Sequence, residues 1–176
     1  PILDPAIYDM GIPILGICYG CQLVAQQLGG VVDRGGRGEY GRATLMRSGQ
    51  SSLLPENAPA SFDVWMSHFD FVSEVPQGFV ATGATPDAPN AIIENNERRI
   101  YGVQYHPEVV HSTHGQELLI RFLVDVAGCR QDWTMANIVE DQIAAIREQV
   151  GSERAICGLS GGVDSSVAAA IVHQAI

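Results

Sequence analysis

Two cysteines, Cys18 and Cys21, stand three positions apart in the stretch GICYGCQ and could serve nucleophilic or metal chemistry. Gly16 and Gly20 flank Cys18 symmetrically after an apolar run, which is the pattern of a nucleophile elbow with cysteine in place of serine. The N-terminus of a following helix would favour the thiolate. The pattern indicates a cysteine nucleophile, and a small buried thiol is the structural alternative.

The same C-x-x-C spacing is also typical of zinc and redox sites. Zinc could be completed by His106, His111 and His114. A structural zinc site usually has a second close ligand pair of matching type, which these irregularly spaced histidines do not form. A zinc-binding or redox module therefore remains the alternative to the nucleophile, and Cys21 is expected to pack on its helix.

A base for a cysteine nucleophile is offered by the stretch QYHPEV. In an extended segment His106 and Glu108 share one face, and Pro107 biases His106 towards extended backbone. Glu108 could then hold one imidazole nitrogen while the other faces the thiol, in the order Cys, His, Glu. A solvated histidine beside a surface glutamate fits these residues equally well.

A third candidate site is the glycine-rich stretch GLSGGVDSS between an apolar run and a helical one. Successive backbone N–H groups at a helix N-terminus bind phosphate oxygens, and serine hydroxyls add donors. Asp164 could hold a Mg²⁺ that bridges the phosphates. The expected phosphate-binding set is Ser160, Gly161, Gly162, Val163, Asp164, Ser165 and Ser166, and an ordinary turn with a serine cap is the alternative.

The elements that must position these residues follow from apolar periodicity. A strand at 12–17 and a helix at 19–28 ending at Gly29 bracket Cys18. Residues 31–105 read as short strands (43–46, 62–66, 79–84, 91–95 and 99–106), with a hairpin at Asn95–Asn96 and a flexible loop at 35–38. Helices are expected at 115–127 and after an N-cap at Thr134, followed by a strand at 155–159 and a further helix.

Composition bounds the class of protein. The 176 residues are 46% hydrophobic and carry a formal charge of −10, which predicts a globular fold and argues against a nucleic-acid partner. All ten basic residues are arginine, which excludes lysine Schiff-base chemistry and the Walker loop. No apolar run or leader suggests a membrane, and four unevenly spaced cysteines favour reduced thiols in the cytoplasm. We expect the chain to be a fragment of something longer.

GICYGCQ, DVWMSH and YGVQYHPEV resemble, in this order, the class I glutamine amidotransferases, and LSGGVDSS resembles the pyrophosphate loop of ATP pyrophosphatases. The ordered set is similar to the glutamine-hydrolysing GMP synthase family. Other amidotransferases of this class lack the SGGVDSS motif, and NAD and asparagine synthetases pair it with unrelated glutaminase domains. The resemblance implies an α/β fold: a flavodoxin-like amidotransferase domain at 1–128, truncated at its N-terminus, a linker at 129–133, and the beginning of an ATP pyrophosphatase domain at 134–176.

The resemblance also implies a ligase that makes GMP from XMP, ATP and glutamine. Cys18 would be the nucleophile, His106 the base and Glu108 its orienting partner, while Tyr19, Gln22, Ser67 and His68 would contact glutamine. The 160–166 loop would bind pyrophosphate with Mg²⁺, no organic cofactor is implied, and a C-terminal domain outside this chain would form a homodimer.

Two departures from the family pattern matter. Phe69 stands where the family usually has glycine, and a positive φ there would strain a bulky residue. The family's oxyanion loop and XMP-binding residues lie outside this chain, so we expect weak or no glutaminase activity, because one oxyanion donor contributes about 3–4 kcal/mol. A non-catalytic nucleotide-binding fragment is the further alternative.

Overall fold

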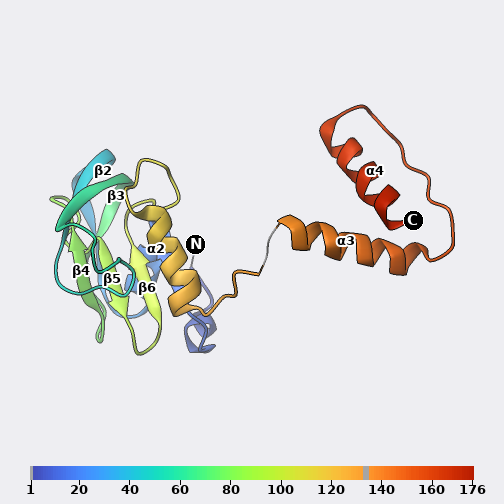
Figure 1. Ribbon diagram of the computed structural model, residues 1–176. Helices are drawn as coiled ribbons and strands as arrows, with labels where there is room; N and C mark the ends of the chain where they lie inside the picture. The colour runs from blue at the N-terminus through green and yellow to red at the C-terminus, as the bar shows by residue number, and fades with distance from the viewer. Residues whose placement is uncertain (1, 133–134) are drawn as a thin grey trace. The chain divides into compact units, whose positions relative to one another are not determined.

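The computed structural model describes residues 2–132 and 135–176, which form two compact units with a division between Cys129 and Arg130 (Figure 1). The first unit is a mixed α/β structure and the second is a pair of helices. Thr134, the expected N-cap, lies outside the described residues. Among those residues no helix is long and apolar enough to cross a membrane.

The first unit is built on a six-stranded sheet in the order β1-β6-β5-β4-β2-β3. Its strands are β1 (Ile14–Ile17), β2 (Val31–Arg47), β3 (Ser61–Glu74), β4 (Val80–Ala84), β5 (Ile92–Asn95) and β6 (Ile100–Val103). Strands β1 and β6 pair in parallel, whereas β2–β3, β2–β4, β4–β5 and β5–β6 are antiparallel pairs. The carboxyl ends of β1 and β6 therefore lie side by side, although 82 residues separate Ile17 from Ile100 in the chain.

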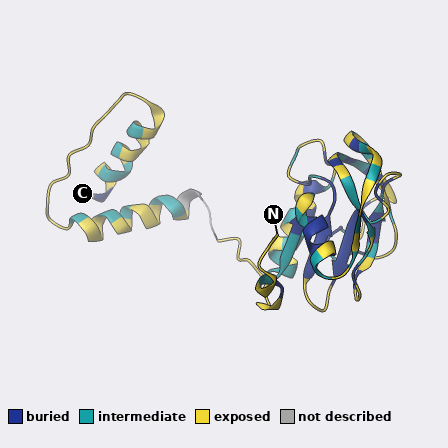
Figure 2. Cartoon of the chain, turned by 180° about the vertical axis from the view of Figure 1, so that it is seen from behind, coloured by how far each residue is buried: buried dark blue, intermediate teal, exposed yellow. Residues whose placement is uncertain are grey.

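Helices cover both faces of this sheet. Successive side chains of β6 point to opposite faces, so they pack against different helices. On one face, Ile100 packs with Cys21, Val24 and Ala25 of α1 (Tyr19–Gln27). On the other, Tyr101 and Val103 pack with Leu118 of α2 (Gly115–Arg121). The buried strands between these helices form the dark core of the first unit in Figure 2.

Most of the expected elements form, with differences at their ends. A short 3₁₀ helix, η1 (Pro5–Asp9), precedes β1. The helix expected at 115–127 starts as α2 and continues as a π-helical turn, η2 (Phe122–Val126). The expected hairpin joins β5 to β6, with Asn95 opposite Ile100; its loop is longer than the two-residue turn suggested by Asn95–Asn96.

Two sequence predictions about local structure are wrong. The glycine cluster at 35–38 is not a flexible loop but lies within β2, where the pairing with β3 shifts between Arg34 and Glu39. The extra residues form a bulge, and β2 is hydrogen-bonded to β3 on both sides of that bulge. The strand expected at 155–159 is irregular and exposed, because no neighbouring strand offers its backbone hydrogen-bond partners in the described part of this unit.

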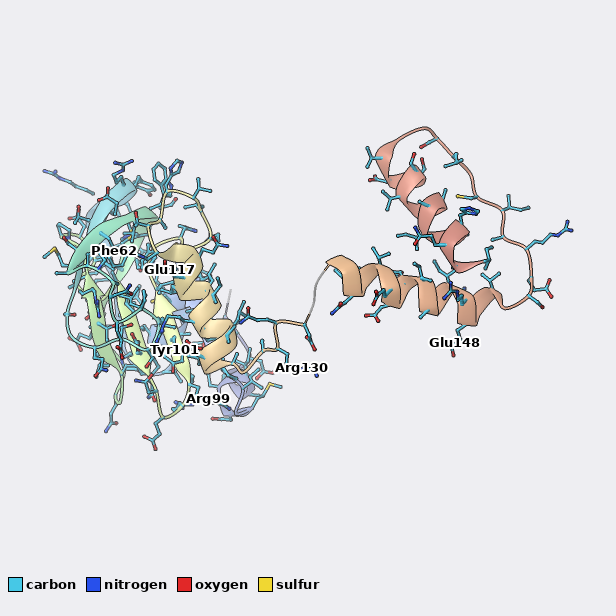
Figure 3. All side chains as sticks on the ribbon, in the orientation of Figure 1. Phe62, Arg99, Tyr101, Glu117, Arg130 and Glu148 are labelled. Atoms are coloured by element: carbon cyan, nitrogen blue, oxygen red, sulfur yellow. The ribbon has the colours of Figure 1, made fainter. Side chains whose placement is uncertain are left out.

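The second unit consists of α3 (Met135–Val150) and α4 (Val163–Ala175), which pack against each other. The expected apolar stripe of α3 is partly buried at Ile138, Ile143 and Ile146. Glu148 points away from α4 (Figure 3). The Arg147 guanidinium closes the pair by donating to the carbonyls of Ala175 and Gln174, at 3.0 and 2.9 Å.

Candidate active site

Cys18 occupies the single position between β1 and α1 in a strained turn. Its backbone has φ 53° and ψ −106°, a conformation that disfavours residues with a Cβ. Its N–H donates to the Val103 carbonyl of β6 at 2.8 Å, and its own carbonyl accepts from Cys21 N–H at 3.1 Å. Gly16 allows this close turn, since a Cβ there would lie 2.5 Å from the Gly20 carbonyl oxygen. The sharp strand-to-helix turn expected from GICYG is present.

The Cys18 thiol is half-buried, and burial raises its pKa. The N–H of Tyr19 and the side-chain amide of Gln104 lower the pKa, while the Glu108 carboxylate raises it further. The helix N-terminus acts in the expected direction, because the Tyr19 N–H lowers the pKa of the Cys18 thiol, although desolvation of the thiol is the larger effect. A thiol whose pKa is raised depends on a base for nucleophilic attack.

His106 and Glu108 lie on the loop that follows β6. The imidazole Nδ1 of His106 is 2.7 Å from the Glu108 carboxylate, which fixes the proton on Nδ1 and leaves Nε2 as the basic nitrogen. The His106 N–H donates to the Trp65 carbonyl of β3 at 2.9 Å. Ser112 strengthens this attachment, because its hydroxyl accepts from Trp65 N–H and donates to the His106 carbonyl. His106 and Glu108 are therefore paired with each other, and the backbone of His106 is bound to β3.

The residues expected to contact glutamine lie in two settings. Tyr19 and Gln22 line a hollow of about 270 Å³ beside the first turn of α1, together with Asp70. Ser67 is exposed on β3, with its carbonyl oxygen 3.7 Å from Cys18 Sγ. His68 instead points into the protein, where its ring contacts Glu39 and the Asp70 carbonyl. The His68 ring is thus occupied by partners within the protein.

Two residues of this region were not identified from the sequence. Gln104 is fully buried, and its Nε2 lies 3.8 Å from Cys18 Sγ. Asp70 has one carboxylate oxygen, Oδ1, that is buried without a hydrogen-bond partner in the described structure. Gln104 lies within the stretch QYHPEV and Asp70 stands two residues after His68, so their places in or beside the predicted motifs are the one signal that could have suggested them.

Phe69 does not carry the strain that its place in the motif suggested. It is absent from the described non-glycine residues with positive φ, which are Cys18, Arg99 and His114. Its ring is partly exposed and lies beneath the Arg34 guanidinium, 5.9 Å from the ring centroid. A bulky residue is accommodated here, because Phe69 lies within β3, where the backbone is extended.

The zinc and redox interpretation of Cys18 and Cys21 is not supported. No group of three or more His, Cys, Asp or Glu residues within 2–132 and 135–176 could hold a metal ion. Cys21 is fully buried in the core, and burial raises its pKa. His111 stacks on Trp65, with ring centroids 4.7 Å apart, and His114 pairs with Glu117 at 2.6 Å. The proposed ligands thus have other partners.

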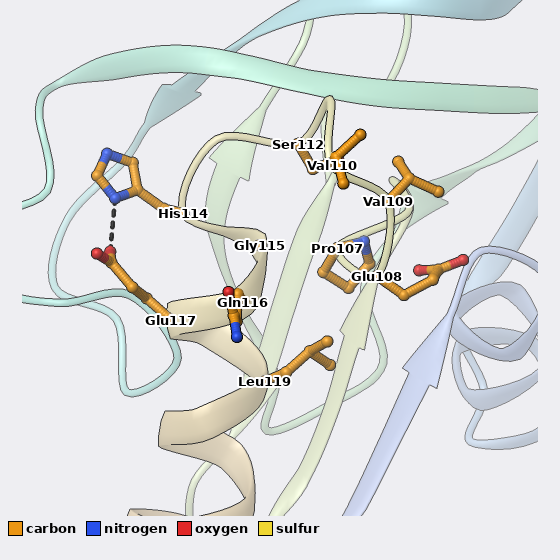
Figure 4. Close-up of a pocket in the computed structure, with 10 residues that line it drawn as sticks. All are labelled: Pro107, Glu108, Val109, Val110, Ser112, His114, Gly115, Gln116, Glu117 and Leu119. Carbon is orange, nitrogen blue, oxygen red and sulfur yellow. Dashed lines mark hydrogen bonds and ion pairs between the residues drawn. The ribbon is translucent and has the colours of Figure 1, made fainter.

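A hollow of about 570 Å³ lies beside the loop that follows His106, and not at the Cys18 thiol. Figure 4 shows Glu108 at one end and the His114–Glu117 ion pair at the other. Its lining includes Glu108 but neither Cys18 nor His106. The smaller hollow at Tyr19, Gln22 and Asp70 is therefore the better candidate for a substrate site.

The glycine-rich loop of the second unit opens α4 as expected. Gly162 is the N-cap, and the hydroxyls of Ser165 and Ser166 donate to its carbonyl at 3.1 and 2.9 Å. The Ser160 hydroxyl lies 3.1 Å from that of Ser165, and Asp164 stands in the first helical turn. The loop is exposed apart from the partly buried Ser165. Its N–H and hydroxyl donors therefore gather at the positive end of a helix of 13 residues.

Comparison with known proteins identifies the class to which this fold and site belong. The family model of class I glutamine amidotransferases matches residues 3–126, so the chain belongs to that family. The NAD synthase family model matches residues 135–176.

Individual relatives are more specific. A GMP synthase (glutamine-hydrolysing) from Thermobifida fusca is 60% identical over all 176 residues, and one from Streptomyces coelicolor is 57% identical over the same span. A solved structure described as a GMP synthase subunit from Thermoplasma acidophilum has a TM-score of 0.65 at 28% identity, covering 69% of this chain and 61% of its own. The chain spans about a third of the length of the two curated relatives, 33% and 34%.

Proposed function

We propose that the first unit hydrolyses glutamine and that the chain acts within the synthesis of GMP from XMP, ATP and glutamine. The observation that carries the proposal is the position of the strained Cys18. It lies beside the carboxyl end of β6, and the His106–Glu108 pair follows this strand in the chain. The relatives named GMP synthase, similar over the whole chain, support this particular product.

The proposed reaction begins when Nε2 of His106 takes the Cys18 thiol proton and Sγ attacks the side-chain carbonyl carbon of glutamine. The tetrahedral intermediate collapses as the imidazolium returns the proton to the departing nitrogen, which leaves as ammonia. A glutamyl thioester remains on Cys18. His106 then deprotonates a water molecule that attacks the thioester, glutamate departs, and the proton returns to Sγ. Glu108 stabilises the imidazolium in both halves of the reaction.

Glutamine recognition is assigned to the hollow at the first turn of α1. The Asp70 carboxylate, which lines this hollow, would accept a hydrogen bond from the substrate α-ammonium group. Tyr19 and Gln22 line the same hollow, and the Ser67 carbonyl lies beside the thiol. The backbone at His68 would complete the site.

The loop at 160–166 would bind the pyrophosphate of ATP during adenylation of XMP, and ammonia would then displace AMP to give GMP. The match to the NAD synthase family model supports a nucleotide role for this segment. Asp164 is a single carboxylate, so it would hold Mg²⁺ only together with phosphate oxygens, which is the usual arrangement for this ion. A homodimer and a cytoplasmic location stay predictions.

The first test treats the chain with a diazo-ketone analogue of glutamine and maps adducts by mass spectrometry. We expect labelling of Cys18 that free glutamine suppresses, while the exposed Cys129 and Cys157 show no such protection. Equal labelling of all three, unaffected by glutamine, would contradict the glutaminase assignment.

The second test replaces the matching third of the Thermobifida fusca enzyme with this chain. The chimera should form GMP from XMP and ATP with either glutamine or ammonium as nitrogen donor. The Cys18→Ala chimera should lose only the glutamine-dependent reaction. Failure with ammonium in both chimeras, despite a folded protein, would contradict the role of the 160–166 loop.

A further inference from the structure

We infer that Gln104 is a further catalytic residue of the Cys18 centre, whose side-chain amide donates to Sγ and stabilises the thiolate. The inference rests on the proposed function for its catalytic meaning, while the hydrogen bond itself can be tested without any substrate.

The position of Gln104 follows from the parallel pairing of β1 with β6. Cys18 directly follows β1 and Gln104 directly follows β6, so both stand at the same sheet edge. The Cys18 N–H bonds to the Val103 carbonyl at 2.8 Å, and the Gln104 N–H bonds to the Ala91 carbonyl at 2.8 Å. Both backbones are thus fixed, and the fully buried Gln104 side chain has little freedom to turn elsewhere.

The orientation of the Gln104 amide is determined by its neighbours. Nε2 of Gln22 lies 2.6 Å from the Asp70 carbonyl oxygen, which can only accept, so this end of the Gln22 amide must be the nitrogen. The same nitrogen lies 3.3 Å from the Gln104 amide, which must therefore present its oxygen. The NH₂ group of Gln104 then faces Cys18 Sγ at 3.8 Å.

The direction of donation therefore runs from Gln22 through Gln104 to the sulfur. A hydrogen bond to sulfur is stronger when the sulfur is charged, so this donor favours the thiolate over the thiol. The amide opposes the two influences that disfavour the thiolate, namely burial and the negative charge of Glu108. It has no proton to lose, so it can act in both halves of the reaction without changing its own state.

The test measures the pH dependence of Cys18 alkylation by iodoacetamide in the 176-residue chain, resolved by peptide mass spectrometry. The variants are Gln104→Met, which keeps volume and removes the donor, and Gln104→Glu, which keeps shape and adds negative charge. We expect the midpoint of Cys18 alkylation to rise by about one pH unit in Gln104→Met, a tenfold slower reaction below the midpoint, and further in Gln104→Glu. Gln77→Met is the control at an exposed glutamine.

Cys129 in the same samples is the internal reference, and its midpoint should not move. A purely structural role would change the accessibility of Cys18, and hence the plateau rate at high pH, without moving the midpoint. Unchanged midpoints in both folded variants would overturn the inference. If either variant does not fold, Gln22→Met tests the same network through the residue that orients the Gln104 amide. Freeing the Gln104 amide should raise the midpoint of Cys18 alkylation by less than one pH unit, and an unchanged midpoint would count against the inference.

The outcome also separates this inference from the proposed function. A shifted midpoint without glutamine-protected labelling of Cys18 would support the hydrogen bond and contradict the glutaminase. Glutamine-protected labelling of Cys18 with an unchanged midpoint would support the glutaminase and contradict the hydrogen bond.

Discussion

Replacing Cys18 by glycine should give a more stable protein than replacing it by alanine, which reverses the usual order of these residues. Both changes remove Sγ and its contacts equally, so the pair isolates the effect of a Cβ at φ 53° and ψ −106°. Holding a non-glycine residue in such a region costs about 1–3 kcal/mol. Glycine loses about 0.5–1 kcal/mol more conformational entropy on folding. The expected net advantage of Cys18→Gly over Cys18→Ala is about 1 kcal/mol.

The assay is urea unfolding followed by the fluorescence of Trp65, with Trp133→Phe in all samples so that only the first unit is observed. An advantage of about 1 kcal/mol corresponds to a higher midpoint at an unchanged slope. Cys129 provides the matched control, because it is an exposed cysteine outside the set with positive φ. At that site alanine should equal or exceed glycine. If alanine is the more stable replacement at Cys18 as well, the elbow stores no strain and the reasoning is refuted.

Three further outcomes are expected. The free energy of unfolding should fall by about 1.4 kcal/mol between pH 7 and pH 10 through Cys21 alone: its folded pKa is raised by burial above the ordinary 9.0, so the unfolded chain ionises first and stability is lost as pH rises. The urea midpoint should depend less on pH in Cys21→Ala than in the unchanged protein. An equal pH dependence in both proteins would contradict the prediction. In the chimera, His106→Ala should lower glutamine-dependent turnover by about 10²–10⁴-fold and Glu108→Gln by less, with ammonium-dependent turnover unchanged; a loss of both would indicate misfolding. Gly16→Ala should destabilise the first unit by about 1–3 kcal/mol, because its Cβ would meet the Gly20 backbone at 2.5 Å; Gly36→Ala, where a Cβ meets nothing within 4 Å, is the control.

Local patterns were sufficient to predict the elbow and its flanking elements. An apolar run, a flanked cysteine and a periodic helix ending at Gly29 correspond to β1, Cys18 and α1. The same is true of the packed position of Cys21, because the helical period places it on the core side with Val24 and Ala25.

The missed features depend on partners that are distant in sequence. The glycine cluster at 35–38 reads as a loop in isolation and is held in β2 by pairing with β3. The apolar segment at 155–159 reads as a strand, yet a strand needs a neighbour that the described second unit does not supply. Gln104 and Asp70 gain their contacts from strand ends brought together by the sheet, and no local pattern in a single sequence encodes such proximity.

The parallel pairing of β1 with β6 also has a consequence for the order of folding. The two strands can meet only by closing a loop that contains α1 and β2 to β5, and such long closures are entropically expensive and slow. Local hairpins such as β5–β6 have no such requirement and can form earlier. We therefore expect the contacts of Cys18 with Val103 and Gln104 to form late in assembly. On this expectation a nascent or partly folded chain carries an ordinary cysteine, and the strained backbone at Cys18 forms only when β1 pairs with β6.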